Sequence, residues 1–213
     1  MWYWNGYPVR RVWDASGSLR VSAEKNVTVY AGQDVSDEQI FKFLDRHRRF
    51  LLTRLRRAEA WEDRFPEVMH CQTVLLFGKE RPLTFVRGGE GVFVRNKRGV
   101  PRAVEALCGE AFLQRVAQWK ERMGVVCGTI SFQYAKTLWG TCDAECNLRF
   151  NRAAMMLPPE LCDYLIVHEL AHCNFRNHGE DFHRFVARFL PDERERRRNL
   201  ANYAFLLSLY RTR

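Results

Sequence analysis

The feature that most constrains this chain of 213 residues is a His-Glu-x-x-His motif, His168-Glu169-Leu-Ala-His172. Residues four apart lie on one face of a helix, about one turn from each other, so His168 and His172 can bind one metal ion together. Glu169 lies roughly 100° further round the helix, within reach of a water molecule on that ion. Two imidazole ligands and a carboxylate that takes the proton of the water are the arrangement of a zinc hydrolase.

The residues around the motif favour a buried active-site helix. Apolar side chains occupy most of positions 164–171, and Pro158-Pro159 precedes them, which is typical of a helix start. We expect the helix to end between Phe175 and Asn177, because Asn177-His178-Gly179 predicts a turn. The alternative is an ordinary helix that carries two hydrogen-bonded histidines and a surface glutamate.

A catalytic zinc ion takes three protein ligands and keeps its fourth position open. His178 lies six residues past His172, so a turn after the helix can bring it back to the metal, and it is the first candidate for the third ligand. The alternatives are the titratable residues that follow it: Glu180, Asp181 and His183. His183 lies in a Phe-rich helical segment, which favours a histidine at the edge of the core.

Other short motifs accompany this segment in a fixed order: Trp139-Gly-Thr-Cys142, Asn147-Leu-Arg-Phe-Asn151, Asn177-His178, Phe182 and Pro191-Asp192. Together with the His-Glu-x-x-His motif they resemble the YgjP-like metallopeptidases, whose Trp-Gly-Ser-Cys signature is similar to the first of them. The resemblance is closest from about Lys136 to Leu200 and looser over the rest of the chain. The SprT-type metalloproteases are similar more distantly.

The resemblance implies a zincin-like α+β fold, with zinc on His168, His172 and His178 and with Glu169 as the catalytic base. Two positions depart from the family pattern. Leu138 stands where the family usually has Arg, and His183 stands where it usually has Trp. These departures can alter substrate contacts, but neither removes a predicted zinc ligand.

Hydrophobic periodicity predicts one compact α+β protein with two lobes. The first lobe, residues 1–98, is β-rich with one long helix, and the second, residues 99–213, carries the zinc site. The expected elements are strands at 9–13, 19–23 and 27–30 that form a small meander, a helix from the capping box Ser36-Asp-Glu-Gln39 to about Glu59, a helix at 101–123, a strand at 148–151 and a helix at 192–210. Phe50 and Leu107 are among the apolar residues predicted to face inward on the two long helices.

The net charge of +9 supports two interpretations. A basic surface attracts nucleic acid or other polyanions, whereas Arg-rich helices are also ordinary solvated faces. No apolar run approaches the ~20 residues of a membrane span, so we expect no membrane partner. The N-terminal residues have no basic start followed by an apolar core, and the cysteine count of seven is odd. We therefore expect a cytoplasmic protein with reduced thiols.

The cysteines offer one further pattern. Cys142 and Cys146 are four residues apart and can in principle help to bind a second metal, but no matching second pair lies nearby in the sequence. Cys173 follows His172 directly and points to a different helix face, so we expect it to pack rather than to bind metal.

These observations predict a zinc-dependent metallohydrolase with one zinc ion per chain, acting on a peptide or protein substrate. The candidate substrate-binding residues are Trp139, Gly140 and Asn147, which flank a strand expected beside the active helix. Tyr164, Lys136 and Arg176 are candidates for stabilising the oxyanion. Two other functions stay open. One is hydrolysis of nucleotide phosphoanhydrides, which the basic charge fits although no phosphate loop is present. The other is a nucleic-acid-associated protein with a structural metal.

Overall fold

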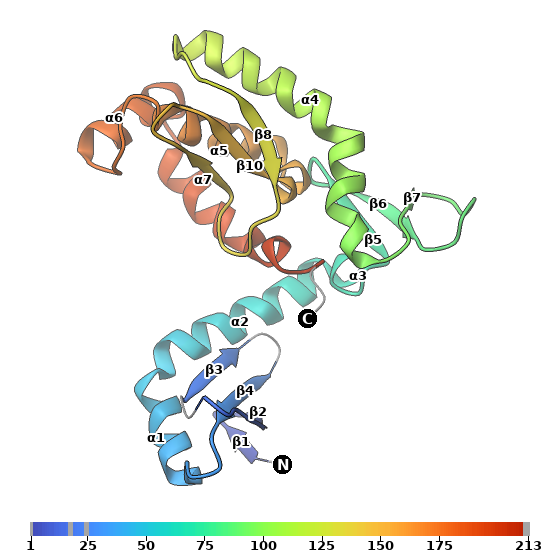
Figure 1. The fold of residues 1–213 in the computed structure, drawn as a ribbon, viewed down its shortest axis with the longest axis vertical. Helices are drawn as coiled ribbons and strands as arrows, with labels where there is room; N and C mark the ends of the chain where they lie inside the picture. Colours follow the sequence, from blue (N-terminus) through green and yellow to red (C-terminus); the bar gives the residue numbers. More distant parts are fainter. Residues whose placement is uncertain (1, 17–18, 24–25, 211–213) are drawn as a thin grey trace. The chain divides into compact units, whose positions relative to one another are not determined.

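The computed structural model describes residues 2–16, 19–23 and 26–210, and the chain divides into two compact units, Met1–Pro66 and Glu67–Arg213 (Figure 1). Helices predominate and the described strands form three small sheets, which confirms the predicted α+β class. The division differs from the predicted one at residue 98. Residues 67–98 belong to the second unit. The N–H groups of Phe77 and Gly78 tie this segment to the rest of that unit, because they donate to the carbonyls of Met155 and Met156 at 2.8 and 3.1 Å.

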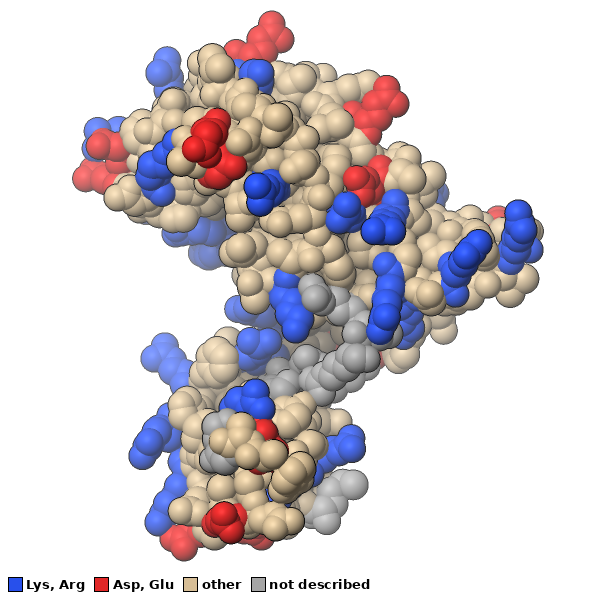
Figure 2. Space-filling view, in the orientation of Figure 1, with Lys and Arg blue, Asp and Glu red and all other residues tan. Residues whose placement is uncertain are grey.

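The charge of the molecule is distributed rather than gathered on one element. On the face shown in Figure 2, Lys and Arg side chains occur on both units, with Asp and Glu side chains among them. Several cations pair with an acid four residues earlier in the same helix: Lys42 with Glu38, Arg184 with Glu180 and Arg196 with Asp192. Such exposed pairs neutralise charge locally and add little stability. Binding to polyanions stays a prediction.

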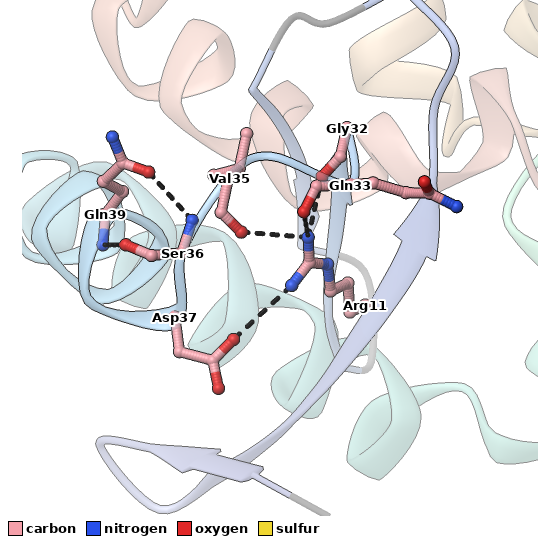
Figure 3. Close-up of polar contacts among 7 residues, drawn as sticks. All are labelled: Arg11, Gly32, Gln33, Val35, Ser36, Asp37 and Gln39. Atoms are coloured by element: carbon pink, nitrogen blue, oxygen red, sulfur yellow. Dashed lines mark hydrogen bonds and ion pairs between the residues drawn. The ribbon is translucent and has the colours of Figure 1, made fainter.

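The first unit contains a four-stranded sheet of order β1-β2-β4-β3. Its strands are β1 (Trp2–Trp4), β2 (Tyr7–Trp13), β3 (Arg20–Ala23) and β4 (Val27–Ala31). The predicted meander is wrong, because β4 pairs with β2 in parallel and with β3 in antiparallel orientation. Arg11 of β2 holds the end of β4 beside it: its guanidinium donates to the carbonyls of Gly32 and Val35 at 2.7 and 2.9 Å and contacts Asp37 (Figure 3).

Two helices pack on this sheet, α1 (Asp37–Arg46) and α2 (Arg48–Arg64). The predicted capping box is confirmed, since Ser36 accepts from the N–H of Gln39 and Gln39 accepts from that of Ser36 (Figure 3). The single predicted helix is interrupted at His47. Because the two helices differ in direction (Figure 1), positions counted at helical spacing across His47 do not share one face. Phe50 is accordingly 58% exposed, with Arg54 beside its ring. The core of the unit consists of Trp4, Val9, Val27, Val29, Ala31, Ile40, Leu44, Leu51 and Leu55.

The second unit contains two three-stranded sheets and the helices that surround them. The strands are β5 (Thr73–Leu76), β6 (Lys79–Thr84), β7 (Val92–Phe93), β8 (Ile130–Gln133), β9 (Gly140–Cys142) and β10 (Leu148–Asn151). The helical segments are α3 (Pro66–Met69), η1 (Lys97–Gly99), α4 (Val100–Met123), η2 (Arg152–Met156), α5 (Pro159–Ala171), α6 (Glu180–Phe189), α7 (Glu193–Leu200) and η3 (Ala201–Leu207). The sheet orders are β5-β6-β7 and β8-β10-β9, so β9 is an edge strand among the described strands. On α4, Leu107 is 60% exposed, contrary to the prediction.

The hairpin between β5 and β6 turns on Phe77 and Gly78, whose φ angles are 47° and 78°. Two consecutive residues with positive φ are typical of the tight turns that match the twist of a hairpin. A Cβ atom at Gly78 would lie 2.9 Å from the Cα atom of Pro158, closer than real contacts allow. The turn therefore packs directly against the residue that precedes α5, and only glycine leaves space for this contact.

Helix α5 is the central element of the second unit. It begins at Pro159, as predicted, and most of its side chains are buried. It ends at Ala171, several residues before the predicted end, because the N–H groups of His172 and Cys173 bond three residues back to Glu169 and Leu170 and tighten the chain. The predicted C-terminal helix is α7 followed by η3, and α7 contacts α5. None of the described helices combines the length and the apolar character that crossing a bilayer requires.

Candidate metal centre and active site

Three histidines converge at the C-terminal end of α5. His168 lies on the helix, His172 is its C-terminal cap, and His178 lies in the loop that leads to α6. Their ligand nitrogens all lie within 4.8 Å of one another, and the Nε2 atoms of His168 and His178 are 3.0 Å apart. The structure thus brings together the three histidines that the sequence singled out.

The other candidates for the third ligand have different partners. Glu180 and Asp181 are exposed and both contact Arg184. The Nδ1 atom of His183 lies 3.1 Å from the buried carboxylate of Glu193. Of the four candidates, only His178 joins His168 and His172 in this cluster.

The surroundings of the three rings orient them. The Nδ1 atom of His172 lies 2.9 Å from the carbonyl oxygen of Phe175, which can only accept, so Nδ1 carries the proton. The Nε2 atom of the neutral ring is then free to bind a metal. Phe182, only 1% exposed, packs against all three rings, with centroid distances of 4.9, 4.7 and 4.8 Å to His168, His172 and His178. An apolar ring therefore backs the cluster.

The surroundings of His168 and His178 favour the neutral imidazole, which is the state that binds metals. The pKa of His168 is lowered to about 3, first by burial and then by the neighbouring His172 and His178. The pKa of His178 is lowered as well, again mainly by burial. The Nδ1 atom of His168 is buried without a hydrogen-bond partner among the described residues. Three convergent imidazoles on an apolar backing are a donor set that fits a divalent ion such as zinc.

Glu169 lies beside this cluster and is only 5% exposed. Burial raises its pKa to about 8, because a carboxylate loses its hydration there. Gly140 of β9 lies directly against it: a Cβ atom at that position would be 2.6 Å from both Cδ and Oε1 of Glu169. The backbone of β9 therefore limits where the Glu169 carboxylate can lie, and it can do so only because residue 140 has no side chain.

A cleft of about 530 Å³ opens over the histidines and Glu169. It is lined by Thr137, Leu138, Trp139, Gly140, Thr141, Cys142, Tyr164, Leu165, His168, Glu169, His172, Arg176, His178, Arg197 and Leu200. Trp139 and Gly140, two of the predicted substrate-binding residues, thus line the cleft. The third, Asn147, is not among the lining residues; its Oδ1 atom accepts from the N–H and the hydroxyl of Thr129 and holds the loop between β9 and β10.

Two of the three candidates for oxyanion stabilisation lie at the cleft. Tyr164 and Arg176 line the cleft, whereas Lys136 is not among its lining residues. Arg197 of α7 lines it too and was missed, because the sequence of α7 is a mixed run of acidic and basic residues that indicates only a solvated helix. Only the packing of α7 on α5 brings this guanidinium to the cleft.

Comparison with known protein families gives one match. The family model for the YgjP-like metallopeptidase domain matches residues 16–203. Comparisons with curated proteins and with solved structures found no match. The matched segment includes the histidine cluster, Glu169 and the strand that covers it. Because the family model extends over most of the sequence, the chain belongs to the YgjP-like family of metallopeptidase domains.

Proposed function

We propose that the protein is a zinc-dependent peptidase in which His168, His172 and His178 hold one zinc ion and Glu169 is the general base. The observation that carries the proposal is the convergence of three imidazoles beside a buried carboxylate in the lining of a cleft. Among the described residues, the His cluster contributes three ligands, which leaves a coordination position for water or substrate. A structural zinc site would more typically have four protein ligands.

The chemistry divides between the metal and the side chains around it. A zinc ion held there would polarise a substrate carbonyl, lower the pKa of its water to about 7 and favour the ionised form of Glu169. Glu169 accepts the proton of the attacking water at its carboxylate and returns it to the leaving amine. Gly140 keeps that carboxylate in place. Tyr164, Arg176 and Arg197 line the cleft and are the groups that can stabilise negative charge on the substrate.

The shape of the cleft supports a peptide substrate. Strand β9 borders the cleft and is an edge of its sheet, so its free side can hydrogen-bond to an extended peptide. Leu138 is 50% exposed at the cleft and offers an apolar contact to a substrate side chain. The competing substrate class, a nucleotide phosphoanhydride, has the net charge of +9 in its favour but no Gly-rich phosphate loop.

Substitution of Glu169 by Gln tests the mechanism. Gln keeps the shape and polarity of the side chain but cannot accept the proton at neutral pH, so peptidase activity should fall by at least about a hundredfold while the zinc content stays that of the wild type. Activity is measured on an unbiased peptide library and zinc by elemental analysis. Loss of zinc from the variant would instead make Glu169 a ligand, and full activity would remove it from the mechanism. A parallel panel of nucleoside triphosphates decides between the two substrate classes.

A further inference from the structure

Three cysteines form a second cluster of metal-binding side chains near the histidines. Cys142 ends β9, Cys146 lies in the loop before β10, and Cys173 follows the end of α5. Their sulfur atoms all lie within 4.8 Å of one another, and those of Cys142 and Cys173 are 3.9 Å apart. All three are free thiols. We expected Cys173 to pack because it points to a different helix face from His172. The sequence alone does not show that α5 ends beside the β9–β10 loop, where the sulfur of Cys173 meets those of Cys142 and Cys146.

The loop between β9 and β10 holds two of these sulfurs in place. The carboxylate of Asp143 accepts the N–H groups of Glu145 and Asn147 at 3.1 and 2.8 Å, and the carbonyl of Asp143 accepts the N–H of Cys146. Cys146 has a φ of 59°, a left-handed conformation that is uncommon for a residue with a side chain. The hydrogen bonds of the loop thus maintain an unfavourable backbone conformation at Cys146.

Arg176 places a positive charge beside the sulfurs. Its guanidinium donates to the carbonyls of Asp143 and Ala144, and its terminal nitrogens lie 3.9 and 3.8 Å from the sulfurs of Cys142 and Cys146. Once a metal has bound, this positive charge attracts the thiolates that hold it. Three thiolates, one divalent ion and one guanidinium also balance to zero charge, so the arginine offsets the excess negative charge of a three-thiolate site.

We propose that Cys142, Cys146 and Cys173 bind a second metal ion, a thiophilic d¹⁰ cation of the class of Zn²⁺ or Cu⁺. Thiolate ligands select these ions over Mg²⁺ and Ca²⁺. The ion joins Cys142 and Cys146 to Cys173, which follows His172. It therefore holds β9 and the β9–β10 loop against the end of α5. A three-thiolate site leaves Zn²⁺ one position for a small exogenous ligand. Binding of an ion at the three cysteines requires neither zinc on the histidines nor catalytic activity.

Cobalt titration of the reduced, metal-free protein tests the site, because Co²⁺ bound to thiolates has an intense sulfur-to-metal charge-transfer band that imidazole ligation lacks. Wild-type protein should bind a second equivalent of Co²⁺ with this band. Cys146→Ser and Cys173→Ser should lose the band, whereas Cys127→Ser, a cysteine outside the cluster, and His178→Ala should keep it. Absence of the band in the wild type, or its persistence in both cluster variants, would overturn the proposal.

A second measurement does not depend on whether the serine variants fold. Wild-type protein is alkylated with iodoacetamide in the presence and absence of metal, and each cysteine is followed by mass spectrometry. Zn²⁺ should protect the three cluster cysteines by at least about tenfold and leave Cys127 unprotected. Cu⁺, supplied anaerobically in a parallel arm, decides between the two ions by competition with Zn²⁺. If neither Zn²⁺ nor Cu⁺ changed the alkylation of the three cluster cysteines relative to the metal-free protein, the proposed site would be refuted.

Discussion

At the scale of single residues, the active site depends on close approaches that admit few substitutions. Gly140 touches Glu169 so closely that even one added methyl group would overlap the carboxylate. The Glu169 carboxylate is thus positioned by the absence of a side chain on the neighbouring strand. This relation links the Trp139-Gly140 motif to catalysis through the position of Glu169.

Gly140→Ala should therefore lower the turnover number while zinc binding remains. The added Cβ atom must displace the Glu169 carboxylate or β9, and displacement of a catalytic group by about 1 Å can reduce the rate about a hundredfold. Overpacking should also cost about 1–3 kcal/mol of unfolding free energy. Gly109→Ala is the matched control, because its Cβ atom would make ordinary contacts at 3.7 Å or more within α4. Unchanged kinetics for Gly140→Ala would show that Glu169 is not held by β9.

The identity of the third ligand is also tested at single residues. His178→Ala should weaken zinc binding about as severely as His172→Ala, because both imidazoles belong to the same cluster. Glu180→Ala should leave the affinity unchanged, since Glu180 contacts Arg184 instead. Competition with a chromophoric chelator measures all three affinities. Normal zinc binding by the His178 variant would show that the third ligand lies elsewhere.

At the scale of elements, local sequence predicted more about which segments form helices and strands than about their neighbours. The capping box at Ser36, the start of α5 and the spacing of His168 and His172 follow from contacts within a few residues. The parallel pairing of β2 with β4, by contrast, depends on Arg11 reaching carbonyls far along the chain. Arg197 in the cleft and Cys173 beside Cys142 depend likewise on packing between distant segments, which periodicity does not encode.

Phe182 of helix α6 packs against all three histidines of the candidate metal centre. Phe182→Ala should lower the unfolding free energy by about 3–5 kcal/mol, because it leaves a cavity at a fully packed ring, and it should weaken zinc binding, because the three imidazoles lose their common support. Phe189→Ala in the same helix is the control: its ring packs on Phe185, and zinc affinity should not change. Denaturant unfolding and chelator competition give the two quantities. An unaltered zinc affinity in Phe182→Ala would mean that the three imidazoles are oriented without the support of the Phe182 ring.

At the scale of the whole molecule, the metal centre lies entirely within the unit Glu67–Arg213. A ligand that binds only the folded state stabilises the unit that holds it. Removal of zinc by a chelator should therefore increase amide hydrogen exchange in α5, α6 and the loop between them, while α1, α2 and the sheet of the first unit keep their protection. Hydrogen-exchange mass spectrometry with and without chelator makes the comparison. An equal loss of protection in both units would show that the metal stabilises the chain as one cooperative body.

The contact between Gly78 and Pro158 extends the mutational sensitivity of the enzyme far from its chemistry. The hairpin turn stands against the residue from which the catalytic helix starts, so any side chain at Gly78 must push on that starting point. A mutagenesis screen scored only by activity would return Gly78 alongside Glu169, although the two act for unrelated reasons. The tip of the β5–β6 hairpin must therefore keep a glycine as long as α5 starts at its present position.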